Sequence, residues 1–259
     1  MLLRELVEKL DALTRVESCY SWDNSGLIIG DLDKDINRVL LCLELTDEVL
    51  EEAIGLNAQL IISHHPVIFS PTKRFVRGLE RGNLVYDLIA SSIASYTAHT
   101  NFDMLEGGLN DYVLNLLGVG ERQELYDEGD RPIGRVFELP EPMKVSDFAK
   151  QIKAALDLPE IRLVIKSDRY VKRVGIVTGS GMDVLLNAKE RLFELFLTGD
   201  VKYHQALDAM NKGYCVIDGG HYGTERFFSE AMFTLMDGYL DGVEIIKSKV
   251  NVNPFQYLE

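Results

Sequence analysis

Short apolar segments alternate with amphipathic segments along most of the chain, and this alternation restricts the fold more than any other feature. Residues 38–45 and 59–63 are typical of buried strands, and residues 95–103 are typical of a strand that runs into a loop. Between the first two, Thr46 is followed by two acidic residues, which is the pattern of a helix N-terminus. Alternating strands and helices predict an α/β fold with largely parallel or mixed sheets.

A polar, turn-rich segment at residues 119–134 interrupts this alternation, and a second run of strands and helices follows it. We therefore predict two similar α/β lobes. The first comprises residues 1–125 and is completed by residues 226–259, and the second comprises residues 126–225. Further helices are expected at residues 80–93, 108–118, 182–192 and 224–240.

The composition excludes several classes of function. The chain carries 27 basic and 41 acidic residues, a net charge of −14. Because affinity for nucleic acid comes largely from basic side chains, this balance argues against nucleic acid as the main ligand. The three cysteines form no C-x-x-C pair, which fits a reducing cytoplasm. Charges interrupt the amphipathic segment 2–13, and no apolar run is long enough to span a membrane. We therefore expect a cytoplasmic protein.

The histidines have an informative distribution, because each lies at a predicted strand end or helix start. The chain contains five of them: His64, His65, His99, His204 and His221. Adjacent side chains on an extended segment point to opposite sides, so the His64–His65 pair can serve two metal ions more easily than one. A loop with two ordinary histidines is the alternative interpretation of this pair.

Two histidines are followed four residues later by a carboxylate. Asp103 follows His99, and Glu225 follows His221 where a strand ends and a helix begins. Helical geometry at the second site would place both side chains on one face. Each pair alone also fits a structural turn. Together, three histidines and two carboxylates are enough to hold two divalent ions that activate water. A glycine turn at 178–183 fits a tight strand–helix connection better than an anion cradle.

Five motifs occur in order along the chain: WDNSGLIIG (22–30), IISHHPVIF (61–69), AHTNFD (98–103), TGDVKYHQALDA (198–209) and IDGGHYGTE (217–225). In series they strongly resemble the GTP cyclohydrolase I type 2 homologue family, also called the NGG-interacting-factor-three-like proteins. The resemblance covers essentially the whole chain. One departure is Tyr203, which stands where the family often has a histidine, so the segment around it is not assigned metal ligands.

The resemblance implies a dinuclear metal site in the cleft between the two lobes. The implied ligands are His64, His65, Asp103, His221 and Glu225. Imidazoles with carboxylates suit two divalent ions of Zn, Fe or Mn. The resemblance also implies a toroidal homohexamer with the metal sites facing an internal cavity. Side chains expected to support the ligands or contact the substrate are His99, Asp200, Lys202 and His204.

Two functions follow from this interpretation. The first is a dinuclear metal-dependent hydrolase, GTP cyclohydrolase-like, that opens a ring of a nucleotide or acts on another small molecule. The alternative is a metal-binding scaffold or regulatory protein that acts through partners without turnover. No order of residues suggests a covalent Ser-His-Asp or Cys-His mechanism.

Overall fold

The computed structural model describes residues 1–78, 80–188 and 192–258, and the chain divides into two compact units. The first unit comprises Met1–Leu105 and Phe228–Pro254, and the second comprises Glu106–Phe227 with the residues from Phe255 onward. The sequence places the first division after residue 125, but the structure places it earlier, after Leu105. The predicted helix at 108–118 therefore belongs to the second unit, because its apolar side chains pack into the core of that unit.

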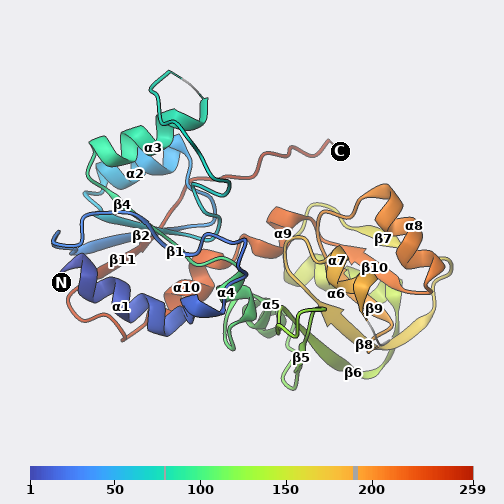
Figure 1. Ribbon diagram of the computed structural model, residues 1–259. Coiled ribbons are helices and arrows are strands. Elements are labelled where there is room, and N and C mark those ends of the chain that lie inside the picture. The colour runs from blue at the N-terminus through green and yellow to red at the C-terminus, as the bar shows by residue number, and fades with distance from the viewer. Residues whose placement is uncertain (79, 189–191, 259) are drawn as a thin grey trace. The chain divides into compact units, whose positions relative to one another are not determined.

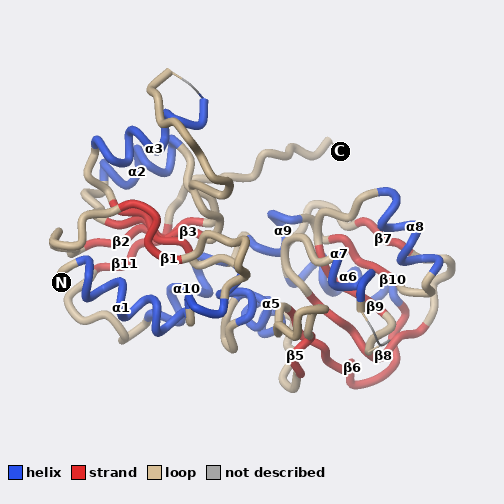
Figure 2. The backbone as a smooth tube through the Cα atoms, viewed as in Figure 1, coloured by secondary structure: helices blue, strands red, loops and turns tan. Residues whose placement is uncertain are grey.

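A five-stranded sheet in the order β1-β4-β3-β2-β11 forms the centre of the first unit (Figures 1 and 2). Its strands are β1 (Gly26–Ile29), β2 (Arg38–Cys42), β3 (Leu60–Ser63), β4 (Ala94–Thr97) and β11 (Glu244–Lys247). All neighbouring pairs are parallel except β1 and β4. Because parallel strands end at one edge of a sheet, the residues that follow β2, β3 and β4 share that edge.

Helices cover both faces of this sheet. Figure 1 shows two of them on one face, α2 (Asp47–Gly55) and α3 (Glu80–Ala90), and two on the other, α1 (Leu3–Thr14) and α10 (Phe228–Met236). The predicted start of α2 is confirmed, since the Thr46 hydroxyl accepts a hydrogen bond of 3.3 Å from the Val49 N–H. Beneath α2 and α3, one face of the sheet contributes Leu40, Cys42 and Ile61 to a buried apolar core.

The second unit contains a six-stranded mixed sheet in the order β5-β6-β8-β9-β10-β7. Its strands are β5 (Gln123–Leu125), β6 (Gly134–Lys144), β7 (Arg162–Val164), β8 (Tyr170–Ile176), β9 (Leu195–Thr198) and β10 (Cys215–Asp218). The three central strands β8, β9 and β10 are parallel, and the outer strands pair antiparallel. The carboxyl ends of three parallel strands therefore meet at one edge of this sheet as well.

The described residues of the second unit also form the helices α5 (Leu109–Leu116), α6 (Val145–Ala155), α7 (Met182–Asn187), α8 (Tyr203–Asn211) and α9 (His221–Glu225). Val113 of α5 and Ile152 of α6 are buried in one core with apolar side chains of the central strands. α8 packs against β7 and β10. Among the described residues, none of the helices combines the length and the apolar character needed to cross a membrane.

Three predicted elements differ from the structure. The helix expected at 224–240 is two helices, α9 and α10, because Phe227 packs against the second-unit core whereas Phe228 is buried in the first unit. The loop expected after β4 is a short helix, α4 (Thr100–Met104). The helix expected at 182–192 ends at Asn187, and residues 189–191 lie outside the described residues.

Candidate metal centre

The adjacent histidines directly follow β3, at a point where the backbone bends. The His64 N–H donates to the Cys42 carbonyl at 3.2 Å, and the His65 N–H donates to the Leu43 carbonyl at 3.1 Å. The His64 side chain is fully buried, and its ring centroid lies 5.0 Å from that of His65. The parallel pairing of β2 with β3 thus fixes both imidazoles at the carboxyl edge of the first sheet.

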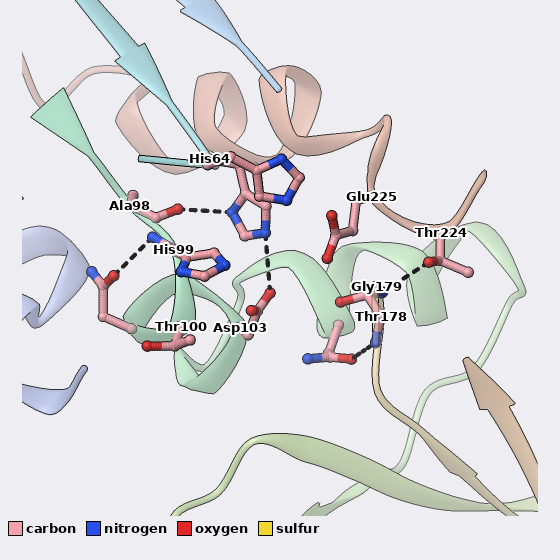
Figure 3. Close-up of polar contacts among 12 residues, drawn as sticks. His64, Ala98, His99, Thr100, Asp103, Thr178, Gly179, Thr224 and Glu225 are labelled. Atoms are coloured by element: carbon pink, nitrogen blue, oxygen red, sulfur yellow. Dashed lines mark hydrogen bonds and ion pairs between the residues drawn. The ribbon is translucent and has the colours of Figure 1, made fainter. Parts of the chain in front are cut away.

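Both imidazoles are oriented by an oxygen at Nδ1. His64 Nδ1 donates to the Ala98 carbonyl at 2.8 Å (Figure 3). A carbonyl oxygen only accepts, so the proton is on Nδ1 and the lone pair is on Nε2. His65 Nδ1 lies 2.7 Å from a carboxylate oxygen of Glu44. The surrounding chain therefore selects the tautomer of each ring that can donate electrons through Nε2.

His99 has the same arrangement, with a buried carboxylate as its partner. His99 Nδ1 lies 2.8 Å from Asp23 Oδ1, and the other oxygen of Asp23 accepts the Thr100 N–H at 3.2 Å. Burial raises the pKa of Asp23, but the hydrogen bond and charge of His99 and the Thr100 hydroxyl outweigh burial and hold this pKa well below its usual range. Asp23 is thus ionised and holds the Nδ1 proton of His99. The sequence predicts a supporting role for His99, and in the structure the partner of its Nδ1 is Asp23.

The first unit brings three imidazoles and one carboxylate together. One nitrogen from each of His64, His65 and His99 lies within 4.8 Å of the other two. Asp103, on α4, places Oδ1 at 3.7 Å from His64 Nε2, and both side chains are buried (Figure 3). Two atoms that each lie about 2.1 Å from one ion at a tetrahedral angle are about 3.4 Å apart. The separation is therefore close to that of two ligands of one ion.

The second unit contributes a histidine and a glutamate from α9. The predicted spacing is confirmed, since His221 Nε2 lies 2.9 Å from Glu225 Oε2 across one turn of helix. His221 Nδ1 lies 2.7 Å from Asp200 Oδ2. Asp200 adopts a positive φ of 53° in the turn after β9, which is a conformation that aspartate tolerates better than most residues. The expected supporting role of Asp200 thus takes the form of a contact with the His221 ring.

Glycines at the carboxyl ends of β8 and β9 make room for this pair. A Cβ on Gly179, which has φ +68°, would lie 1.9 Å from Glu225 Oε1 and 3.3 Å from His221 Nε2. A Cβ on Gly199 would lie 2.5 Å from the backbone N of His221. Gly199 requires glycine because the close atoms belong to the backbone, and Gly179 favours glycine through its positive φ. The glycine turns therefore serve the placement of His221 and Glu225.

The turn at 178–183 uses its N–H groups within the protein. The Thr178 N–H donates to Asn110 Oδ1 at 3.0 Å, and the Gly179 N–H donates to Thr224 Oγ1 at 2.9 Å (Figure 3). The Gly181 N–H donates to Thr198 Oγ1 at 2.8 Å. These donors hold the strand ends together, which favours the tight turn over the anion cradle. The bond from Gly179 also fixes the helix that carries Glu225.

Four of the five histidines thus have an oxygen at hydrogen-bond distance from Nδ1, and the Nε2 atoms of His64 and His221 face carboxylate oxygens of Asp103 and Glu225. This is the usual environment of metal-binding histidines, whose second nitrogen is held by a carboxylate or carbonyl. The residues present fit divalent ions of the borderline class, since imidazole and carboxylate are their common ligands. His204 differs, because it is exposed on α8 with its ring against that of Tyr203. Lys202, which caps the start of α8, is also exposed.

Sequence reasoning missed two of the orienting carboxylates, Glu44 and Asp23. Glu44 follows β2 and Asp23 precedes β1, so neither is near its histidine in the sequence. The acidic residue directly after Trp22 in the first motif was the available signal for Asp23. No comparable signal marks Glu44, which is a single charged residue between two leucines in a segment typical of a strand.

The fold and these side chains define a class of protein: two α/β units, with groups of histidine and carboxylate side chains that could hold a metal ion. The chain belongs to the Duf34/NIF3 (NGG1p interacting factor 3) family, whose model matches residues 1–254. It is 33% identical to the GTP cyclohydrolase 1 type 2 homolog of Streptococcus pneumoniae, over the full length of both chains. It is 32% identical to the protein of that name from Clostridium perfringens, also over both full lengths. The resemblance that the five motifs indicate is therefore confirmed.

Solved structures show the same fold. A Staphylococcus aureus hypothetical protein is 29% identical, with a TM-score of 0.92 over 100% of this chain and 99% of that one. A Bacillus cereus protein related to NIF3 is 23% identical, with a TM-score of 0.90 over the same shares. The second likeness concerns the fold alone. Both agree with two sheets arranged as mixed α/β units.

Proposed function

We propose that this protein is a dinuclear metal-dependent hydrolase that acts on a nucleotide. In this proposal His64, His65, Asp103, His221 and Glu225 bind two divalent ions. The observation that carries the proposal is the shared environment of His64, His65, His99 and His221, each of which has an oxygen at hydrogen-bond distance from Nδ1. The name shared by the two bacterial relatives, GTP cyclohydrolase 1 type 2 homolog, supports a nucleotide as substrate.

In this proposal several residues of the chain orient the metal ligands or make room for them. Ala98, Glu44 and Asp200 hold the Nδ1 protons of the ligand histidines, which fixes each ring and raises its basicity. Gly179 allows the Glu225 carboxylate to sit beside the His221 ring. When bound, divalent ions act as Lewis acids that make water nucleophilic at neutral pH and stabilise negative charge on the reacting group.

Two further parts of the proposal concern assembly and location. A homohexamer is proposed from the family resemblance, and light scattering of the purified chain would measure it. A cytoplasmic location is proposed from the sequence, in which the three cysteines form no C-x-x-C pair. The ions would be Zn, Fe or Mn, the metals that imidazole and carboxylate ligands favour.

The test combines metal analysis with a substrate screen. Protein purified without added metal should contain about two divalent ions per chain. It should hydrolyse at least one compound in a panel of nucleotides and phosphoesters, with the products detected by chromatography. Asp103→Asn should lower metal content and hydrolysis together, whereas Asp237→Asn, at an exposed position after α10, should change neither. Full turnover by the metal-free protein would contradict the proposal.

A second function is favoured by the family description, NGG1p interacting factor 3, which names an interaction rather than a reaction. In this alternative the metal-loaded protein acts through partners without turnover. The same screen separates the two, because a hydrolase turns over a small molecule in the absence of any other protein. Absence of turnover across the panel, with full metal content, would favour the scaffold.

A further inference from the structure

An exposed group of aromatic side chains lies in the first unit, and we call Tyr20, Trp22 and Phe69 the aromatic platform. The Trp22 side chain is 57% exposed and that of Phe69 is 55% exposed. The Tyr20 and Trp22 rings are stacked, with centroids 5.1 Å apart and an interplanar angle of 13°. Phe69 meets Trp22 edge-on at 6.0 Å. Single exposed apolar residues are common on protein surfaces, but three touching rings form a continuous patch.

The aromatic platform is continuous with the histidine cluster. The Trp22 ring approaches His99 edge-on, with centroids 6.4 Å apart, and Phe69 does so at 6.2 Å. His99 in turn contacts the rings of His64 and His65 at 5.2 and 5.7 Å. A flat molecule lying on the platform would therefore lie beside the imidazoles of the candidate metal centre.

Hydrogen bonds fix the backbone segments that carry the rings of the platform. The Asp23 N–H donates to the Tyr20 carbonyl at 3.0 Å, and the buried Asp23 carboxylate is anchored on His99. Asn24 Nδ2 donates to the Ile68 carbonyl at 2.6 Å, which ties the Trp22 turn to the segment that carries Phe69. Because the backbone on both sides is fixed, the rings remain exposed in a defined arrangement. Rigid aromatic groups lose little entropy when a ligand binds.

We propose that the aromatic platform binds a planar heteroaromatic ring of the substrate by stacking. The inference rests on the proposed function and narrows its substrate to molecules that carry such a ring, as nucleotides do. Stacking does not depend on one base, since every base has a π face. The aromatic platform adjoins the histidine cluster, where the substrate would react. We therefore infer that its occupant is a ring of the substrate itself. A second copy of the chain is the competing occupant, which the test below distinguishes.

Trp22 reports directly on this contact, because it is the only tryptophan in the chain. The metal-loaded full chain would be titrated with GMP, AMP and ribose 5-phosphate, with fluorescence excited beyond nucleotide absorption. Saturable quenching by GMP or AMP, and none by ribose 5-phosphate, is expected. The ribose phosphate is the matched probe because it lacks only the base. Equal responses to all three compounds, or no response to either nucleotide, would overturn the proposal.

Variants test whether stacking supplies the affinity. Trp22→Ala and Phe69→Ala should each weaken binding of the quenching nucleotide, measured by calorimetry, by about 5- to 150-fold, which is the range for one stacked base. Trp22→Phe should lose less, because it keeps a ring. Tyr170→Ala, which removes an exposed aromatic ring from β8, should bind like the wild type. Unchanged affinity in both alanine variants would overturn the proposal.

Two further readouts separate this inference from its competitors. If Trp22→Ala changes the mass measured by light scattering and leaves nucleotide affinity unchanged, the platform is a contact between copies and the inference fails. Metal content and hydrolysis are measured on the same samples. Base-dependent quenching without any hydrolysis would contradict the proposed hydrolase function and would support ring binding by the platform. Hydrolysis of phosphoesters with no preference for an aromatic ring would support the hydrolase and overturn the platform.

Discussion

Replacement of Gly179 by alanine should remove metal while costing little stability. The added Cβ would lie 1.9 Å from Glu225 Oε1, where real Cβ contacts are essentially never below 3.0 Å. The Glu225 carboxylate must therefore move by about 1 Å, and metal ligands tolerate only about 0.2 Å. Because the carboxylate is the far end of a flexible side chain, it can move without disturbing the core. The binding contribution of Glu225 is lost and most of the fold remains.

The stability cost comes from the backbone. Gly179 has φ +68°, and an alanine held in this left-handed region costs about 1–2 kcal/mol. Gly118 provides a matched control, since its φ is +72° and a Cβ there would meet nothing within 4 Å. Both variants should lose a similar free energy of unfolding in urea. The Gly179→Ala variant alone should lose metal.

The assay is elemental analysis of both variants purified without added metal, paired with urea unfolding. Gly118→Ala should keep the metal content of the wild type. Full metal content in Gly179→Ala would refute the role of Glu225. An equal loss of metal in both variants would refute the reasoning from the close contact and would assign the effect to the backbone.

Two further predictions concern orienting groups, and a third concerns His204. Glu44→Gln should lower metal affinity about 10- to 100-fold, measured by competition with a chelator, because it removes the charge that holds His65 Nδ1. The pKa of Asp23 is lower in the folded state than in the unfolded state. Its ionised carboxylate therefore stabilises the fold at every pH above the unfolded pKa of about 3.9. This stabilisation is lost as the pH falls from there through the folded pKa. In urea unfolding, Asp23→Asn should therefore have a lower free energy of unfolding than the wild type at pH 7, and the difference should be smaller at pH 3. An equal difference at the two pH values would contradict this prediction. His204→Ala should keep full metal content by elemental analysis, since this ring is exposed against Tyr203.

Much of the fold follows from local patterns. The capping Thr46, the buried strands that end before His64 and the four-residue spacing of His221 and Glu225 are all properties of short segments. Hydrophobic periodicity and helix-start signals act over such distances, so they predict these elements well. The mixed sheet of the second unit also agrees with its alternating strands and helices.

The orienting contacts could not be predicted in the same way. Glu44 meets His65 across the pairing of β2 with β3, and Asp23 meets His99 from a turn 76 residues earlier. Such contacts depend on the register of strands and on turn geometry, which a single sequence does not specify. The break between α9 and α10 is similar, because two neighbouring phenylalanines pack into different units.

The central claim is that the histidines bind metal through Nε2 while oxygens hold Nδ1. Anomalous diffraction from crystals of the Zn²⁺-loaded protein tests it most directly. The account predicts metal peaks about 2.0–2.1 Å from Nε2 of His64 and of His221, with the Nδ1 contacts to Ala98 and Asp200 retained. Peaks at Nδ1, or none at either histidine, would contradict it.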